Sequence, residues 1–178
     1  MYILRQLPFR DAASFVEVAG EPIAIRPYQI IVWVSLSVSE VLDADAPRFP
    51  AVLDTGHNHN FSIRERQLLR WAGIGADMLP QLGEILVNQR EVPLLAVSLW
   101  IHQNRAGSNE LLPRSYRLDL PQGIAVYADE TIGAPRLPLL GLRGLVTNEL
   151  YLTIDGTHRW VSLRTSSNSR ASQSPRRR

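Results

Sequence analysis

Apolar and polar residues alternate along much of the chain in short runs, and this period of two is typical of β-strands. The runs lie at residues 28–38, 48–53 and 84–101, and the last is divided by a turn near Asn88-Gln89. Alternation in the first run predicts one buried and one solvated face. We expect the apolar Val34, Leu36 and Val38 to face the core and Ser35 and Ser37 to face solvent.

The chain closes with the pattern of a β-hairpin. Residues 150–154 and 159–163 both alternate, and between them lies Asp155-Gly156, a pair that favours tight turns. Further strands are expected at residues 123–127 and 137–140. These runs predict a mainly β protein.

One segment has a clear helical signature. Ser62 and Glu65 have the spacing of a capping box, in which a hydroxyl begins the helix and a carboxylate follows three residues later. A short helix over residues 64–72 is therefore expected, ending at Gly73. Its predicted buried side chains are Leu68, Leu69 and Trp71. With a turn or short helix after Gly141, the sequence predicts one or two short helices.

The two ends of the chain differ from its centre. Residues 1–27 are mixed in pattern, and two interpretations stay open: a pro-segment or a part of the sheet. Residues 164–178 contain five Arg, no acid and no apolar residue able to anchor a fold, which predicts a disordered Arg/Ser-rich tail. One domain is expected over residues 28–163. Within it, Gly and Pro punctuate an insertion at 102–136, which would either serve as a lid or fill a groove.

Composition removes several classes of function. The chain has no Cys, which excludes disulfides, thiol catalysis and Cys-ligated zinc. Every one of its 19 basic residues is Arg, and without the tail 14 Arg face 17 acids. Nucleic acid is thus not an expected partner, except through the tail. No run of membrane-spanning length and no leader segment occur, so we expect a cytoplasmic protein with no membrane partner.

One motif carries candidate chemistry. Asp54-Thr55-Gly56 follows the apolar Val52-Leu53 and would place a carboxylate at a tight turn, beside backbone N–H groups and a hydroxyl. A carboxylate in this setting can activate water. An apolar-apolar-Gly element, Leu139-Leu140-Gly141, occurs about half the chain later. Because Asp-Thr-Gly occurs only once, a second carboxylate would have to come from a second copy of the chain.

In this order, the long strand, the Asp-Thr-Gly strand, the hairpin, Leu139-Leu140-Gly141 and the closing strand pair resemble the single-domain, retropepsin-like aspartic proteases. The resemblance covers residues 28–163. It implies a closed acid-protease barrel, a homodimer, a peptide or protein substrate and no cofactor. Asp54 of each copy would share one proton with the other, so that one carboxylate acts as base on water while the other donates to the scissile carbonyl.

The resemblance also implies roles for the neighbouring residues. Thr55 would hydrogen-bond across the dimer interface, and Gly56 would let its backbone N–H approach the carboxylate. Leu139, Leu140 and Gly141 would pack under the loop. His57, Asn58 and His59 follow the motif and are candidate binding residues.

The sequence departs from the family at two places near this motif. His57 stands where the family usually has Ala or Ser, and residues 73–82 are too short for a glycine-rich flap. These departures leave open an alternative, a weak or inactive pseudoprotease that serves as a dimerisation or peptide-binding module. His57 and His59 would also point the same way beside Asp54, but no third metal ligand lies close in sequence, so no metal is expected.

Overall fold

The computed structural model describes residues 1–166 of the 178. Most of the predicted disordered tail therefore lies outside the described residues. The described chain is mainly β, as predicted, with two α-helices and one 3₁₀ turn. The helical elements are α1 (Glu65–Ala72), η1 (Ala76–Met78) and α2 (Leu142–Thr147). The strands are β1 (Tyr2–Pro8), β2 (Ser14–Val18), β3 (Glu21–Ile25), β4 (Ile31–Ser37), β5 (Phe49–Asp54), β6 (Phe61–Arg64), β7 (Gln81–Val87), β8 (Arg90–Leu95), β9 (Ser98–Asn104), β10 (Leu111–Leu118), β11 (Ile124–Tyr127), β12 (Leu139–Gly141), β13 (Leu150–Asp155) and β14 (Trp160–Thr165).

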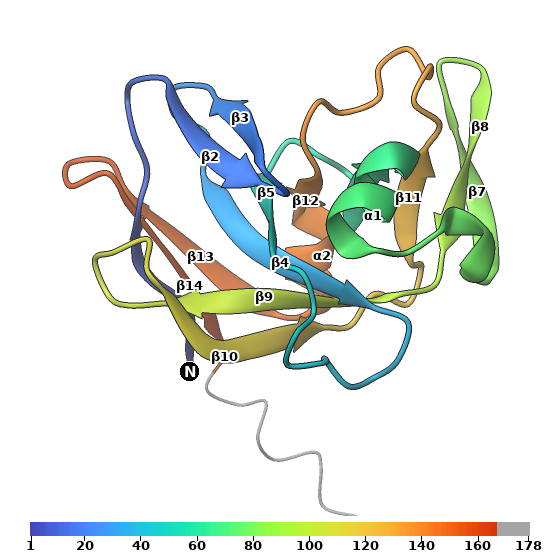
Figure 1. Cartoon of the computed structure of the whole chain (residues 1–178). Helices are drawn as coiled ribbons and strands as arrows, with labels where there is room; N and C mark the ends of the chain where they lie inside the picture. Colours follow the sequence, from blue (N-terminus) through green and yellow to red (C-terminus); the bar gives the residue numbers. More distant parts are fainter. Residues whose placement is uncertain (167–178) are drawn as a thin grey trace, which may run out of the picture.

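A nine-stranded sheet with the order β10-β9-β4-β5-β12-β6-β11-β8-β7 forms the body of the molecule (Figure 1). Its pairs are antiparallel except β5–β12 and β6–β11, which are parallel. The expected closed barrel is not found among the described strands. β10 and β7 are free edges, because β1, β14 and β13 form a separate sheet and do not extend the large one.

The centre of the large sheet positions the candidate site. β5 and β6 are consecutive in the sequence but do not pair with each other. β12 lies between them, parallel to β5 and antiparallel to β6. Phe49, Phe61 and Leu140 in these strands are fully buried. Strands covered on both faces need not alternate, which explains the continuous apolar runs here.

Helix α1 packs against β4, β6 and β11 and begins later than predicted. Its N-cap is Arg64, whose backbone N–H donates to Gln67 Oε1 over 3.2 Å, while Ser62 lies inside β6. The predicted end is confirmed: Gly73 has a left-handed backbone with φ of 71°. Leu68 and Trp71 are buried as expected, but Leu69 is exposed because it points away from the sheet.

Strand β4 buries Val34 and Leu36 as predicted, yet two neighbours contradict the alternation. Val38 is exposed because the strand ends at Ser37. Ser35 is fully buried, and its hydroxyl is satisfied there: it donates to Pro47 O over 2.7 Å and lies 2.8 Å from His102 Nε2. A satisfied hydroxyl can occupy a core position.

Residues 102–136 contribute the end of β9, β10 and β11 to the large sheet. Strand β10, which pairs with β9, was not predicted; it is an edge strand interrupted by a register shift, so its alternation is weak. The predicted strand at 123–127 is β11. Residues 128–136 cross beside α1, where the Arg64 guanidinium donates to the carbonyl oxygens of Asp129, Ala134 and Pro135.

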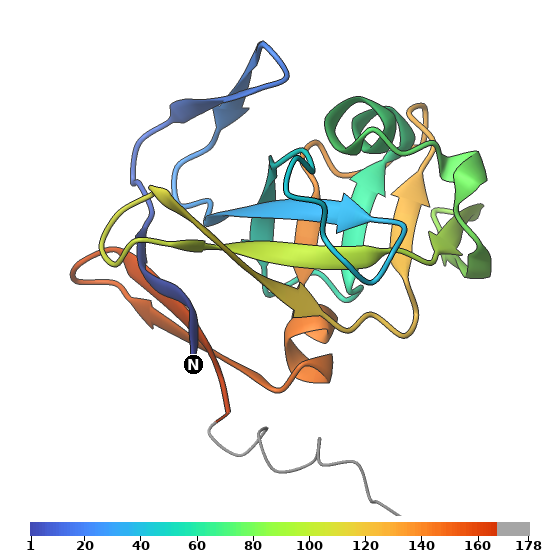
Figure 2. The same ribbon diagram turned by 60° about the horizontal axis from the view of Figure 1, so that its bottom comes forward.

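The N-terminal 27 residues contribute three strands. β1 pairs with β14, and β14 pairs with β13, so the first strand completes the sheet of the final hairpin. β2 and β3 form a two-stranded ribbon that stands away from the large sheet (Figure 2). The predicted closing hairpin is confirmed with a four-residue connection. β14 extends to Thr165, so the predicted start of the tail at residue 164 was wrong. No helix within residues 1–166 is long and apolar enough to cross a membrane.

Candidate active site

Asp54 is the last residue of β5, and its side chain is half-buried. Its Oδ1 accepts a hydrogen bond of 2.9 Å from the backbone N–H of Gly56. The His57 N–H donates to Asp54 O over 3.2 Å, which closes a tight turn. Thr55 and Gly56 at the turn are exposed. The carboxylate is thus fixed at the end of a buried strand while its turn faces outward.

The Leu139-Leu140-Gly141 element lies directly beside this turn. It forms β12, in which Leu139, Leu140 and Gly141 pair with Val52, Leu53 and Asp54. The N–H of Gly141 donates to Asn60 O, and the N–H of Leu142 donates to His57 O, both over 3.0 Å. The structure therefore brings together the two motifs that the sequence suggested, from positions more than 80 residues apart.

Gly141 leaves no room for a side chain. A Cβ atom built there would lie 2.0 Å from His59 O and 2.6 Å from His57 O. Both neighbours are backbone atoms, which cannot rotate away. This contact requires glycine and fixes residues 57–59 against the start of α2.

The half-buried His57 side chain points toward the interior of the sheet. Its Nε2 lies 2.7 Å from Ser62 Oγ, and the Ser62 hydroxyl also hydrogen-bonds the Tyr127 side chain. Burial lowers the pKa of His57, the neighbouring His59 lowers it further, and the Asp54 carboxylate acts in the opposite direction. A neutral imidazole is therefore favoured next to the candidate catalytic carboxylate.

The remaining two members of the predicted binding group differ in setting. Asn58 is exposed, whereas the His59 ring contacts the His57 ring edge-on at 5.3 Å between centroids. Burial and the nearby Arg143 lower the pKa of His59. Within residues 1–166, no group of three or more His, Asp or Glu side chains is placed to hold a metal.

No hairpin precedes β7 in the position expected for a flap. Residues 73–82 hold η1 and the start of β7. The next hairpin is β7–β8, which turns at Asn88 and Gln89 with φ of 49° and 65°, as the predicted turn required. Its tip is tied to the 128–136 segment, because Asn88 Nδ2 donates to Ile132 O over 3.0 Å.

Ser62, Asn60 and Tyr127 were not expected near the candidate site from the sequence. Ser62 was assigned to a helix cap because its spacing to Glu65 imitates one. Asn60 is buried and donates from Nδ2 to Gly123 O over 3.3 Å. Tyr127 ends a strand expected from its alternation, but nothing local indicates that it meets Ser62.

No model of a known protein family matches this chain, and no curated protein matches it significantly.

Proposed function

We propose that this protein is a retropepsin-like aspartic peptidase that acts as a homodimer on peptide or protein substrates. The observation that carries the proposal is the Asp54 carboxylate, which accepts a hydrogen bond from the Gly56 N–H. Close packing of Gly141 against the backbone of His57 and His59 holds this turn in place. A scaffold protein has no need of a carboxylate held in this way at an outward-facing turn. The proposal retains Asp54, Thr55 and Gly56 as its catalytic element.

The reaction needs two such carboxylates. Asp54 of each copy would approach the other across a two-fold axis, and like charges at that separation share one proton. The ionised carboxylate removes a proton from water, whose oxygen attacks the scissile carbonyl carbon while the protonated carboxyl donates to the carbonyl oxygen. Collapse of the tetrahedral intermediate breaks the C–N bond, and the amine nitrogen takes up a proton as it leaves.

A second function is favoured by two observations near the same turn. His57 occupies a position where a small residue is expected, and the segment before β7 holds no glycine-rich hairpin. A site without a lid retains water and holds a peptide poorly. These features favour a weak or inactive relative of the peptidases that binds peptides or dimerises.

The experiment is cleavage of a diverse peptide library from acidic to neutral pH, with wild type beside Asp54→Asn. Because an amide cannot act as the base, we expect cleavage by wild type and none by the variant. The dimer is checked by sedimentation, which should give about twice the chain mass of 20.0 kDa. Equal cleavage by both proteins would refute the role of Asp54. No cleavage at any pH by a folded dimer would favour the binding module, with His57→Ala as the variant to test for recovery.

A further inference from the structure

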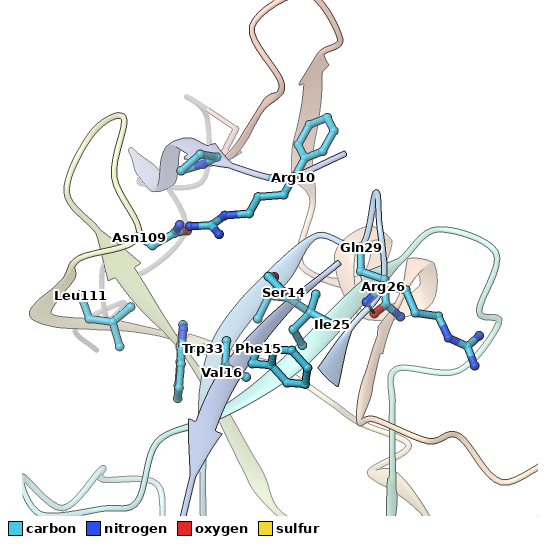
Figure 3. A pocket seen from close by; sticks show the side chains of 13 residues that line it. Arg10, Ser14, Phe15, Val16, Ile25, Arg26, Gln29, Trp33, Asn109 and Leu111 are labelled. Atoms are coloured by element: carbon cyan, nitrogen blue, oxygen red, sulfur yellow. Dashed lines mark hydrogen bonds between the residues drawn. The ribbon is translucent and has the colours of Figure 1, made fainter. Parts of the chain in front are cut away.

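A cavity of about 310 Å³ lies between the β2–β3 ribbon and the start of β4 (Figure 3). Its volume is in the range of pockets that bind small ligands or single side chains. The walls are mainly apolar and aromatic and come from the end of β1 and the segment after it, the ribbon, the start of β4, and β10 with the loop before it. The residues used below are Arg10, Phe15, Ile31, Trp33 and Leu111.

The strand register connects this cavity to Asp54. Ile31 pairs with Val52, and Trp33 pairs with Pro50, in the antiparallel β4–β5 ladder. The ladder continues one step further, because the N–H of Leu53 donates to Ile30 O over 2.9 Å. Asp54 follows Val52 by two residues in β5, so its side chain projects from the face that Val52 shares with Ile31.

Directly opposed residues of antiparallel strands project from the same face of the sheet. The side chains of Ile31 and Trp33, which line the cavity, therefore share a face with the Asp54 carboxylate. The cavity extends along β4 from Ile31, which lies opposite Val52, two residues before Asp54. A polypeptide bound at Asp54 could place a neighbouring side chain there.

The cavity also has a charge. It is lined by Arg10 and Arg26 and by no acidic residue. The carboxylate next in sequence, Asp11, is paired with Arg159, and no ion pair of Arg10 occurs within residues 1–166. In Figure 3, Arg10 reaches across one end of the cavity toward Asn109, whereas Arg26 points away from it. One unneutralised guanidinium at the mouth favours an anionic ligand group.

We propose that this cavity is a substrate subsite that takes a large apolar or aromatic side chain with an adjacent Asp or Glu. The apolar group would contact Trp33, Ile31 and Leu111, and the carboxylate would pair with Arg10. The ring of Phe15, which is 72% exposed on the ribbon, would be covered by the bound chain. The inference rests on the proposed function, because it assigns the occupant to a polypeptide substrate.

The chain's own C-terminal segment does not fit this role. Residues 164–178 carry five Arg and no acid, so Arg10 would repel them, and they offer no large apolar side chain. Charge and shape thus favour a separate acidic and apolar peptide.

The test measures binding without cleavage. Asp54→Asn protein is titrated into three fluorescein-labelled peptides that differ only at two adjacent positions, Asp-Phe, Arg-Phe and Asp-Ala, at neutral pH and low salt. Fluorescence anisotropy gives each Kd. We expect the Asp-Phe peptide to bind at least tenfold more tightly than either of the others.

Variants then locate the site. Arg10→Glu in the Asp54→Asn background should weaken Asp-Phe binding at least tenfold and abolish the preference over Arg-Phe. Trp33→Ala should abolish the preference for Phe over Ala and leave the preference for Asp over Arg. The matched control is Arg114→Glu on the exposed face of β10, which should change the Kd by less than twofold. Circular dichroism of each variant checks that the fold is retained.

The subsite is refuted if the three peptides bind equally, or if Arg10→Glu and Arg114→Glu have the same effect. It is also refuted if Arg10→Glu abolishes dimer sedimentation without any change in peptide binding, since a second copy would then occupy this face. Failure of the proposed function is a separate result. Asp-Phe binding with the expected variant pattern, but no cleavage by wild type at any pH, would retain the subsite and reject the peptidase.

Discussion

At the scale of single residues, the candidate site depends most on Gly141. Its absent side chain lets β12 approach the backbone of residues 57–59, and the same contact fixes the turn that holds Asp54. Gly141, which would not contact a substrate, therefore controls the geometry of Asp54, which would. Errors of about 1 Å in such a group can reduce rate by about a hundredfold.

Gly141→Ala should be strongly destabilising, because the new methyl group would overlap two carbonyl oxygens. We expect a loss of about 3 kcal/mol or more in the free energy of unfolding, measured by urea denaturation. The control is Gly156→Ala in the β13–β14 turn, where a Cβ has nothing within 4 Å. That variant should stay within about 0.5 kcal/mol of wild type. Equal stability of the two variants would contradict the tight contact.

His102 should make the fold sensitive to acid. It is buried beside Ser35, and burial, helped by the nearby Arg48, lowers its pKa to about 4. The unfolded chain then binds a proton at higher pH than the native protein does, so stability falls as pH drops from about 6.5 to 4.

The expected loss from this group is at most about 3 kcal/mol at the acidic end of that range. Unfolding by urea at several pH values measures it, with His102→Gln as the comparison because its amide can still donate to Ser35. The variant should lose less stability on acidification than wild type. Parallel pH profiles for the two proteins would show that His102 does not titrate in this range. If the protein is a peptidase with an acidic pH optimum, that optimum must lie at a pH where protonation of His102 has not yet unfolded the protein.

At the scale of elements, Gln67 has the capping role that the sequence assigned to Glu65, because the N-cap is Arg64 and not Ser62. The Gln67 side chain accepts from the Arg64 N–H and donates to Arg136 O over 2.8 Å, and it is buried. It thereby joins the start of α1 to the segment that leads into β12.

Gln67→Ala should lower the free energy of unfolding by about 2 kcal/mol, because it leaves buried backbone groups without partners. Thermal or urea unfolding measures the change, and Arg66→Ala on the exposed side of α1 is the control. If Gln67→Ala unfolds like the control, the cap is not a source of stability.

The elements also show how far the sequence could lead. The Asp-Thr-Gly strand, the final hairpin and the Asn88-Gln89 turn were predicted because their signals are local. Strand β10 was missed because an edge strand needs only weak alternation, and Ser35 was misplaced because its partner, His102, is 67 residues away. The cavity over β4 could not be predicted, since the β2–β3 ribbon, β4 and β10, which are far apart in the sequence, come together to form it and no local pattern encodes their contact.

At the scale of the whole molecule, β1 ties the beginning of the described chain to its end. Ile3, Leu4 and Leu7 are almost fully buried, and the strand pairs with β14. Each such side chain contributes about 1.5–3 kcal/mol by burial. A segment with these contacts is a structural part of the domain, whereas a pro-segment would be removable.

Removal of residues 1–8 should therefore destabilise the protein by more than about 5 kcal/mol, which approaches the full stability of many domains. Urea unfolding and limited proteolysis of the truncated chain provide the measurement. Tyr2→Ala, at an exposed position of the same strand, is the control and should have a small effect. A truncated chain as stable as wild type would instead favour the pro-segment.

The N-terminal amine of Met1 donates to Thr165 Oγ1 over 3.0 Å, so the two ends of the folded region touch. A chain with this geometry can be joined end to end by a few flexible residues and opened elsewhere without loss of any strand. The turn at Ala19 and Gly20, between β2 and β3, is exposed and offers a place for the new ends. A circular permutant opened there would keep β1 paired with β14, but β2 and β3 would no longer be joined by a turn. Such a protein should still fold, whereas the ribbon that covers the cavity would be loosened and ligand binding there weakened.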